Sequence, residues 1–278
     1  MAIITLTTDI GTQDFLVGAI KGQILQQNVN NNIVDITHSL IPFNYPHSAY
    51  ICRSAIKNFP ENSYHIVIAD FFDSKPEHIL FVKHNSQYIA CADNGLLTMI
   101  LEETPQQVVK LSLEKSRRKN LLYCTRIIIN AIAKIESGEN LESTGTISND
   151  FVVKNSMKPL LGPNYIEGQI MFIDNFENVV VNIRHEQFEE QRKGRKFQIL
   201  FKRNEIIDRI SETYADVQEG ELLATFNSAN YLEISMNKGN VSGLIGLQRF
   251  SDQPSRDQAQ FSQTRMMYQT VKIIFIDQ

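Results

Sequence analysis

Over its first 136 residues the chain alternates short β-rich runs with stretches of helical periodicity, and this alternation constrains the fold more than any other feature. The expected strands are 2–7, 32–35 and 64–69, followed by a hairpin over 79–83 and 88–90. The expected helices lie at 15–26, 46–58, 96–103 and 126–136. Strands that alternate with helices predict a mainly parallel sheet with helices on both faces. We therefore expect an α/β domain at residues 1–160.

The pattern changes beyond the turn-rich sequence Gly162-Pro163-Asn164, where short alternating runs replace the helical stretches. These runs lie at 166–174, 179–183, 196–201, 222–226, 231–235 and 268–276. Their spacing is typical of a small antiparallel barrel or sandwich. A length of 278 residues also favours two domains. We expect a smaller β domain at residues 165–278, with the polar stretch 251–263 as an exposed loop before the last strand.

Charge and composition exclude several classes of protein. A formal net charge of −4 argues against nucleic acid or an anionic membrane as a partner. No stretch approaches the roughly 18 apolar residues of a membrane helix, and the N-terminus lacks the pattern of a signal peptide. The three cysteines, Cys52, Cys91 and Cys124, lack the paired spacing of a zinc site. We therefore expect a cytoplasmic protein with reduced cysteines and no bound metal.

Three carboxylates follow expected strands at equivalent positions. Asp9, Asp35 and Asp70 each follow an apolar strand, and the carboxyl ends of parallel strands form the edge where open α/β sheets bind ligands. Each aspartate alone is explained as well by a helix cap or a turn. Three together favour a functional site.

Four motifs in the sequence, taken together, resemble one family. They are Thr8-Asp9-Ile10-Gly11-Thr12-Gln13-Asp14, Asp35-Ile36-Thr37-His38-Ser39, Asp93-Asn94-Gly95-Leu96-Leu97 and Ile173-Asp174-Asn175-Phe176-Glu177-Asn178. In this order they resemble the S-adenosylmethionine (SAM) hydroxide adenosyltransferases, whose relatives include fluorinating and chlorinating enzymes. The resemblance covers most of the chain.

The resemblance implies an α/β domain followed by a β-barrel, assembled as a homotrimer. The ligand is then expected between the first domain of one subunit and the second domain of its neighbour. The implied reaction is attack of water or hydroxide on the 5′ carbon of the adenosyl group, which releases adenosine and methionine. SAM is the substrate, and no cofactor is expected.

The resemblance also implies roles for individual residues. Asp9 is expected to accept hydrogen bonds from both ribose hydroxyls, a role that suits a group with acceptors only. Phe43 is expected to form an aromatic wall beside the sulfonium, where cation–π attraction acts, although a place in the core explains this residue too. The remaining substrate-binding residues are Asp14, Asp174 for the methionine ammonium, Asn178 for the adenine edge and Ser228 for the methionine carboxylate.

The sequence departs from this family at the residues expected to activate water. The resemblance implies that the hydrolysing members use an Asp, an Arg and a His for this task. Here Asp70 is retained, but no arginine lies between Arg53 and Arg117, and Tyr123 stands where the histidine is expected. We therefore expect Asp70 and Tyr123 to be the catalytic residues, with Lys75 or His78 as further candidates. Glu177 occupies a position beside the adenine contact that is normally glycine.

Three hypotheses follow. The first is a working SAM hydrolase with a reduced catalytic set. The second is an inert sensor that binds SAM or adenosine. The third is a divalent metal held by Asp9, Asp14, Asp35 and His38 for phosphoester hydrolysis. Halogenation is disfavoured, because the thiol of Cys124 stands where those relatives offer a serine hydroxyl.

Overall fold

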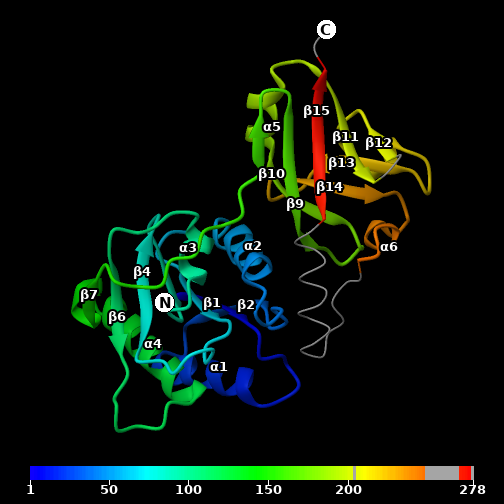
Figure 1. Ribbon diagram of the computed structural model, residues 1–278. Helices are drawn as coiled ribbons and strands as arrows, with labels where there is room; N and C mark the ends of the chain where they lie inside the picture. Colours follow the sequence, from blue (N-terminus) through cyan, green and yellow to red (C-terminus); the bar gives the residue numbers. More distant parts are fainter. Residues whose placement is uncertain (203–204, 248–268, 277–278) are drawn as a thin grey trace. The chain divides into compact units, whose positions relative to one another are not determined.

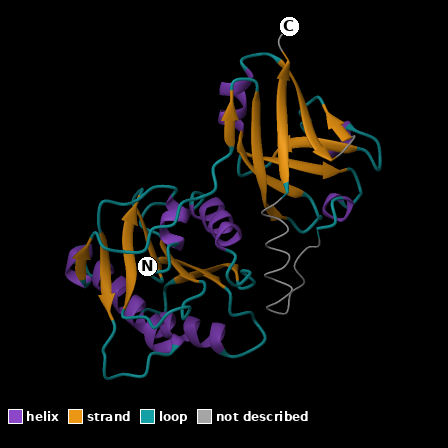
Figure 2. Ribbon diagram, viewed as in Figure 1, coloured by secondary structure: helices purple, strands orange, loops and turns teal. Residues whose placement is uncertain are grey.

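The computed structural model describes residues 1–202, 205–247 and 269–276, and the chain divides into two compact units, Met1–Ser156 and Met157–Gln278 (Figure 1). The stretch 251–263, expected to be an exposed loop, lies outside the described residues. The two units are built differently. The first mixes helices with strands, whereas the second consists mainly of strands (Figure 2).

A seven-stranded sheet forms the centre of the first unit, in the order β2-β1-β3-β5-β4-β6-β7. The strands are β1 (Ile3–Thr8), β2 (Asn32–Thr37), β3 (Tyr64–Ile68), β4 (His78–His84), β5 (Gln87–Cys91), β6 (Val108–Ser112) and β7 (Thr146–Ser148). The pairs β1–β2, β1–β3 and β3–β5 are parallel, whereas β4–β5, β4–β6 and β6–β7 are antiparallel. The sheet is therefore mixed, and the expectation of a mainly parallel sheet is wrong.

The tight turn between β4 and β5 explains this difference. Asn85 and Ser86 both have positive φ, 46° and 62°, as the central residues of a tight hairpin turn require. The turn reverses the chain, and β6 then joins the outer side of β4 in the antiparallel sense. The sequence predicts this hairpin, but the periodicity of single runs does not reveal how the following strands pair.

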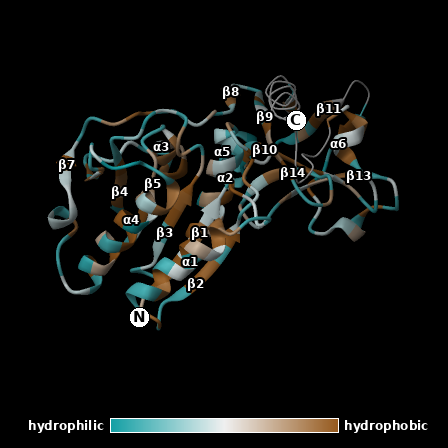
Figure 3. Ribbon diagram, turned by 90° about the horizontal axis from the view of Figure 1, so that it is seen from below, coloured by the Kyte–Doolittle hydropathy of each residue, from teal (hydrophilic) through white to brown (hydrophobic). Residues whose placement is uncertain are grey.

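Helices cover both faces of the first sheet. They are α1 (Leu16–Gln27), α2 (Tyr45–Ile56), α3 (Leu96–Leu101) and α4 (Leu121–Glu136), with a short 3₁₀ turn at Leu141–Thr144. Helices α1 and α4 pack on one face, and α2 and α3 pack on the other. In Figure 3, α4 carries hydrophilic and hydrophobic residues side by side along its length, as expected of a helix with one buried face. No helix in the described part of the chain is long and apolar enough to cross a membrane.

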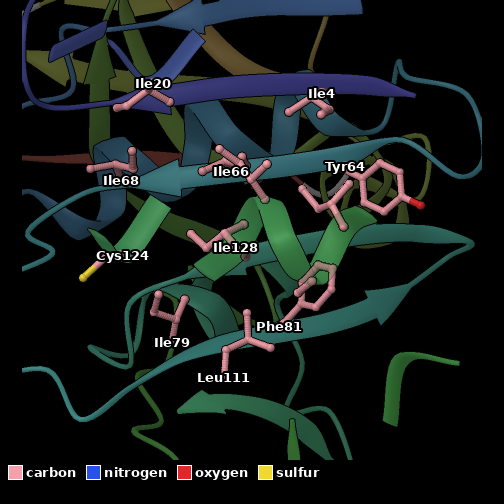
Figure 4. Packing of buried hydrophobic residues seen from close by; sticks show 14 of the residues in the cluster. Ile4, Ile20, Tyr64, Ile66, Ile68, Ile79, Phe81, Leu111, Cys124 and Ile128 are labelled. Carbon is pink, nitrogen blue, oxygen red and sulfur yellow. The ribbon is translucent and has the colours of Figure 1, made fainter. Parts of the chain in front are cut away.

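The alternation of side chains along the strands produces the two cores. Ile66 and Ile68 of β3 pack against α1 and α4, whereas Val67 between them packs on the opposite face. Successive side chains of a strand point to opposite faces, so an unbroken apolar run indicates burial on both sides. Figure 4 shows Ile128 of α4 among Ile66 and Ile79 in the first of these cores.

The second unit is an antiparallel, barrel-like sheet in the order β12-β11-β15-β9-β10-β14-β13, with β8 paired to β9. Its elements are β8 (Leu160–Gly162), β9 (Tyr165–Ile173), β10 (Val179–Arg184), α5 (His185–Arg192), β11 (Lys196–Lys202), β12 (Glu205–Ile207), a 3₁₀ turn (Tyr214–Asp216), β13 (Leu222–Phe226), β14 (Tyr231–Met236), α6 (Val241–Leu244) and β15 (Thr270–Ile276). The end strands β12 and β13 approach each other, which nearly closes the sheet. A separate apolar core fills this unit.

Burial of α4 predicts a large effect of one truncation. Ile128 is fully buried against β3 and β4, so Ile128→Ala is expected to lower the free energy of unfolding by about 2–5 kcal/mol, from lost apolar burial and the cavity left behind. Ile147→Ala, on the edge strand β7 where the side chain is 48% exposed, is the matched control and is expected to cost less than about 1 kcal/mol. Urea denaturation followed by circular dichroism measures both, and equal losses would contradict this assignment of the core.

Candidate functional site

The carboxyl ends of β1 and β3 bring Asp9 and Asp70 together. These strands are parallel neighbours, so their ends lie at the same edge of the sheet. The backbone N–H of Asp70 donates a hydrogen bond to the Asp9 carboxylate, 2.7 Å from Oδ2, and the backbone N–H of Asp9 donates to the carbonyl of Ile68 at 3.0 Å. The Asp9 side chain therefore fixes the backbone at the point where Asp70 leaves the strand.

Phe43 holds the carboxylate of Asp70 from the other side. Its backbone N–H lies 2.9 Å and 2.8 Å from the two carboxylate oxygens of Asp70. Both residues have positive φ, 61° for Phe43 and 47° for Asp70, a conformation unfavourable for residues other than glycine and concentrated at functional sites. The Phe43 ring is 42% exposed, so it does not belong to the core.

The surroundings of Asp70 raise the pKa of its carboxyl group to about 6. Burial is the largest cause, since only 9% of the residue is exposed, and the nearby charges of Asp9 and Asp73 act in the same direction. The N–H of Phe43 and the charge of Lys154 oppose them. Burial also raises the pKa of Asp9. A carboxylate with a pKa about 6 is ionised at neutral pH and is a better proton acceptor than an ordinary aspartate.

His38 of the second motif contacts Thr8 of the first motif and Asp35 of its own. The His38 ring lies between Thr8, at 2.9 Å from its hydroxyl, and Asp35, at 3.2 Å from its carboxylate. Asp35 also accepts a hydrogen bond from Lys21 at 2.5 Å. Among the described residues, no group of three or more His, Cys, Asp or Glu side chains is arranged to hold a metal ion. Asp35 and His38 are therefore accounted for as structural residues, and the metal hypothesis gains no support.

The third motif lies between β5 and α3, and its Asn94 binds the backbone just beyond β3. The side-chain amide of Asn94 donates to the carbonyl of Ala69 at 2.9 Å, and its oxygen accepts from the backbone N–H of Leu96 at 3.1 Å. Asp93 pairs with the ring of His78 at 2.7 Å. His78, a candidate for positioning water, is thus paired with Asp93, and no hydrogen bond joins it to Asp70 in the described structure.

Tyr123 lies in the first turn of α4, which begins where the Asn120 side chain accepts a hydrogen bond from the Tyr123 backbone. The Tyr123 hydroxyl accepts a hydrogen bond from the backbone N–H of Glu114 at 2.9 Å. In the described part of the chain no hydrogen bond joins Tyr123 to Asp70. Cys124 beside it is fully buried, and burial raises the pKa of its thiol to about 11, so it is not a nucleophile at neutral pH.

Asp14 is exposed and accepts a hydrogen bond from the backbone N–H of Leu16 at 2.8 Å, where α1 begins. This contact satisfies one of the amide groups that a helix leaves unpaired at its start. The contact explains why an acidic residue occupies this position. The role of Asp14 in binding substrate stays a prediction.

In the second unit, Asp174 and Asn178 form one turn between β9 and β10. The Asp174 carboxylate accepts hydrogen bonds from the backbone N–H groups of Phe176, at 2.8 Å, and Asn178, at 2.9 Å, and from the Asn178 side chain at 3.0 Å. Ionised carboxylates accept about four hydrogen bonds, so about one acceptor position remains. Asn178 is 3% exposed, and its side-chain nitrogen is the group that donates to Asp174.

Glu177 lies in the same turn with φ of 64°, the left-handed conformation that favours glycine. Its carboxylate accepts a hydrogen bond from the hydroxyl of Ser242 on α6. Glu177 is thus directed toward α6. Ser228 is exposed in the turn between β13 and β14, beside Asn227, whose side chain accepts from the backbone N–H groups of Ala229 and Tyr231.

The raised pKa of Asp70 predicts a pH-dependent effect on stability. The folded protein holds the Asp70 proton more tightly than the unfolded chain, whose aspartates have a pKa about 3.9. The stability that this proton contributes is present below about pH 4 and lost as the pH rises through about 6. Asp70→Asn keeps an acceptor for Phe43 and is expected to stabilise the protein at pH 8 by at most about 3 kcal/mol. Thermal unfolding at pH 4.5 and pH 8 tests this, and a variant with no greater advantage at pH 8 would refute it.

The chain is similar to proteins of known name over most of its length. The chain is 27% identical over 257 residues to the (R)-S-adenosyl-L-methionine hydrolase of Methanocaldococcus jannaschii, covering 88% of this chain and 92% of the relative. It is 22% identical to the protein of the same name from Thermus thermophilus, covering 86% of this chain and 94% of the relative. It is also 22% identical to a fluorinase from Actinopolyspora mzabensis, covering 86% of this chain and 92% of the relative.

The fold is shared with solved structures. A crystal structure of an uncharacterized conserved protein from Thermotoga maritima superposes with a TM-score of 0.79 at 23% identity, covering 98% of this chain and 99% of the other. The family models for the SAM hydroxide adenosyltransferase N-terminal and C-terminal domains match residues 4–145 and 168–252. The chain therefore belongs to the SAM hydroxide adenosyltransferase family.

Proposed function

We propose that this chain is an enzyme that hydrolyses SAM to adenosine and methionine, with Asp70 as the group that activates water. The observation that carries this proposal is the buried Asp70 carboxylate, which accepts from the backbone N–H of Phe43, lies beside Asp9 and has its pKa raised to about 6. Relatives of this chain bear the name SAM hydrolase. A carboxylate at the carboxyl edge of the sheet is where a ligand of an α/β domain is expected.

The reaction needs little from the protein at the leaving group. Water attacks the 5′ carbon in line with the carbon–sulfur bond, the bonding electrons leave with sulfur, and methionine departs as a neutral thioether. The proton lost by the attacking water passes to the Asp70 carboxylate. The enzyme's contribution is therefore alignment, exclusion of other water and acceptance of this proton.

Substrate contacts are proposed for both units. Asp9 accepts hydrogen bonds from the ribose hydroxyls, with Phe43 beside the sulfonium and Asp14 nearby. The one acceptor position left on Asp174 suits an ammonium group, and the Asn178 oxygen suits the adenine amino group. Ser228 contacts the methionine carboxylate. Completion of the site by a neighbouring subunit, in a cytoplasmic homotrimer, is part of this proposal, and sedimentation of the purified protein tests the trimer.

A second candidate is an inert protein that binds SAM or adenosine. The observation that favours it is that the Tyr123 hydroxyl accepts from the backbone of Glu114, with no hydrogen bond to Asp70 in the described structure. Loss of the arginine and histidine with retention of the ligand contacts is expected of a sensor. Turnover distinguishes the two candidates directly.

Hydrolysis predicts release of adenosine and methionine in equal amounts from purified protein incubated with SAM, measured by chromatography. Because the named relatives specify the (R) form, both sulfonium epimers are assayed separately. Asp70→Asn is expected to lower kcat about 100-fold or more, the usual contribution of a positioned base. The rate of the unmodified protein is expected to rise as the pH passes through about 6 and then level off, because Asp70 must be ionised to accept the proton.

Asp150→Asn is the matched control, since this carboxylate is 98% exposed, and its kcat is expected to be unchanged. Calorimetry with SAM accompanies the assay. Binding without product from either epimer would exclude the hydrolase and establish the sensor. Full activity in Asp70→Asn would show that another group activates water.

A further inference from the structure

The segment that ends the first unit crosses the third motif and is fastened to it. The backbone N–H of Val152 donates to the Asp93 carboxylate at 2.7 Å. Two residues later, the N–H of Lys154 donates to the hydroxyl of Thr98 at 3.0 Å, and this hydroxyl donates to the carbonyl of Lys154 at 2.7 Å. These contacts fix the backbone of Lys154 beside α3, far along the chain from Asp70.

Gly95 provides the path for the Lys154 side chain. A Cβ at this position would lie 2.5 Å from Cγ and 2.7 Å from Cδ of Lys154, which is closer than non-bonded carbon atoms approach each other. Gly95 also has φ of 89°, which side-chain-bearing residues rarely adopt. Space and backbone conformation both require glycine in the Asp93-Asn94-Gly95 motif, and the lysine stem occupies the space.

The Lys154 ammonium reaches the Asp70 site. It lies 3.4 Å from the ring centroid of Tyr45, a distance typical of a cation–π contact. Tyr45 begins α2, two residues after Phe43, whose N–H binds the Asp70 carboxylate. Lys154 interacts electrostatically with both Asp70 and Asp73, yet no described carboxylate forms an ion pair with it. Its charge therefore acts on Asp70 through space.

Apart from Lys154, the charged groups among the described residues that act on the Asp70 pKa are acidic. Asp9 and Asp73 carry negative charge toward it, and both oppose its ionisation. Burial, with the charges of Asp70 and Asp73, raises the pKa of the Tyr45 hydroxyl to about 12, so Tyr45 stays protonated. Among the described groups that act on the Asp70 carboxyl, Lys154 is the cation, and its charge partly opposes the effects of burial, Asp9 and Asp73 on the pKa of that carboxyl. Burial lowers its own pKa, and the charges of Asp73 and Asp70 act in the opposite direction.

We propose that Lys154 is the positioning cation of the Asp70 site, held over Gly95 and Tyr45 so that Asp70 stays ionised and ready to accept the proton of the attacking water. This inference rests on the proposed hydrolase function. Lysine is a compact point charge without the planar fork of arginine. It therefore stabilises the charge of Asp70 without fixing a second hydrogen bond to it.

Lys154→Met tests the proposal, because methionine keeps an unbranched stem over Gly95 and removes the charge. The acidic limb of the kcat–pH profile is expected to move to higher pH, with KM changed less than kcat. A displacement of one pH unit gives a roughly tenfold loss of kcat below the limb. Lys154→Arg is expected to restore the profile. Lys158→Met, an exposed lysine four residues further along the chain, at the start of the second unit, is the control and is expected to match the unmodified protein.

A second measurement does not depend on turnover. The titration midpoint of the Asp70 carboxyl, followed by ¹³C NMR with Asp70→Asn for assignment, is expected to rise in Lys154→Met and not in Lys158→Met. If the Asp70 midpoint rises in Lys154→Met but the unmodified protein releases no adenosine, the role of Lys154 is supported and the hydrolase function is refuted. The proposal would be overturned if Lys154→Met changed neither the titration midpoint of Asp70 nor the kcat–pH profile. It would also be overturned if Lys75→Met displaced the kcat–pH profile and Lys154→Met did not.

Discussion

The hydrogen bond from the backbone N–H of Asp70 to the Asp9 carboxylate is the constraint on which the candidate site depends. It joins the ends of two parallel strands and sets the backbone of Asp70 in a left-handed conformation. That conformation directs the carboxylate toward the N–H of Phe43, itself left-handed. Two unfavourable backbone conformations persist at one site because the surrounding contacts fix them, which is typical of functional positions.

Burial of the Asp70 carboxyl group at this edge of the sheet destabilises its ionised form. Asp70 is nearly inaccessible, lies close to two other carboxylates and is only partly compensated by Phe43 and Lys154. A site optimised for stability alone would not gather these charges. The arrangement instead gives a carboxylate that gains a proton near neutral pH, which is the property a proton acceptor requires.

In the second unit, a carboxylate is likewise held by backbone N–H groups, here within a turn. Asp174 organises the β9–β10 connection by accepting hydrogen bonds from Phe176 and Asn178, so one carboxylate both shapes the turn and retains an acceptor position. Glu177 adopts the left-handed conformation there although it is not glycine, and its contact with Ser242 directs its charge toward α6. The extra side chain that departs from the family pattern is thus held by a specific partner.

The sequence by itself determined the two-part organisation, the carboxylates at the strand ends and the motifs that identify the family, because strand periodicity and turn residues are local properties. It also predicted the hairpin at β4–β5. Only the tertiary structure decided that half of the first sheet is antiparallel, since pairing depends on contacts between distant strands. It likewise engaged the Tyr123 hydroxyl with the backbone of Glu114 and brought Lys154 against Tyr45, near Asp70. A charge that reaches a site from a remote segment leaves no local pattern, so no reading of neighbouring residues reveals it.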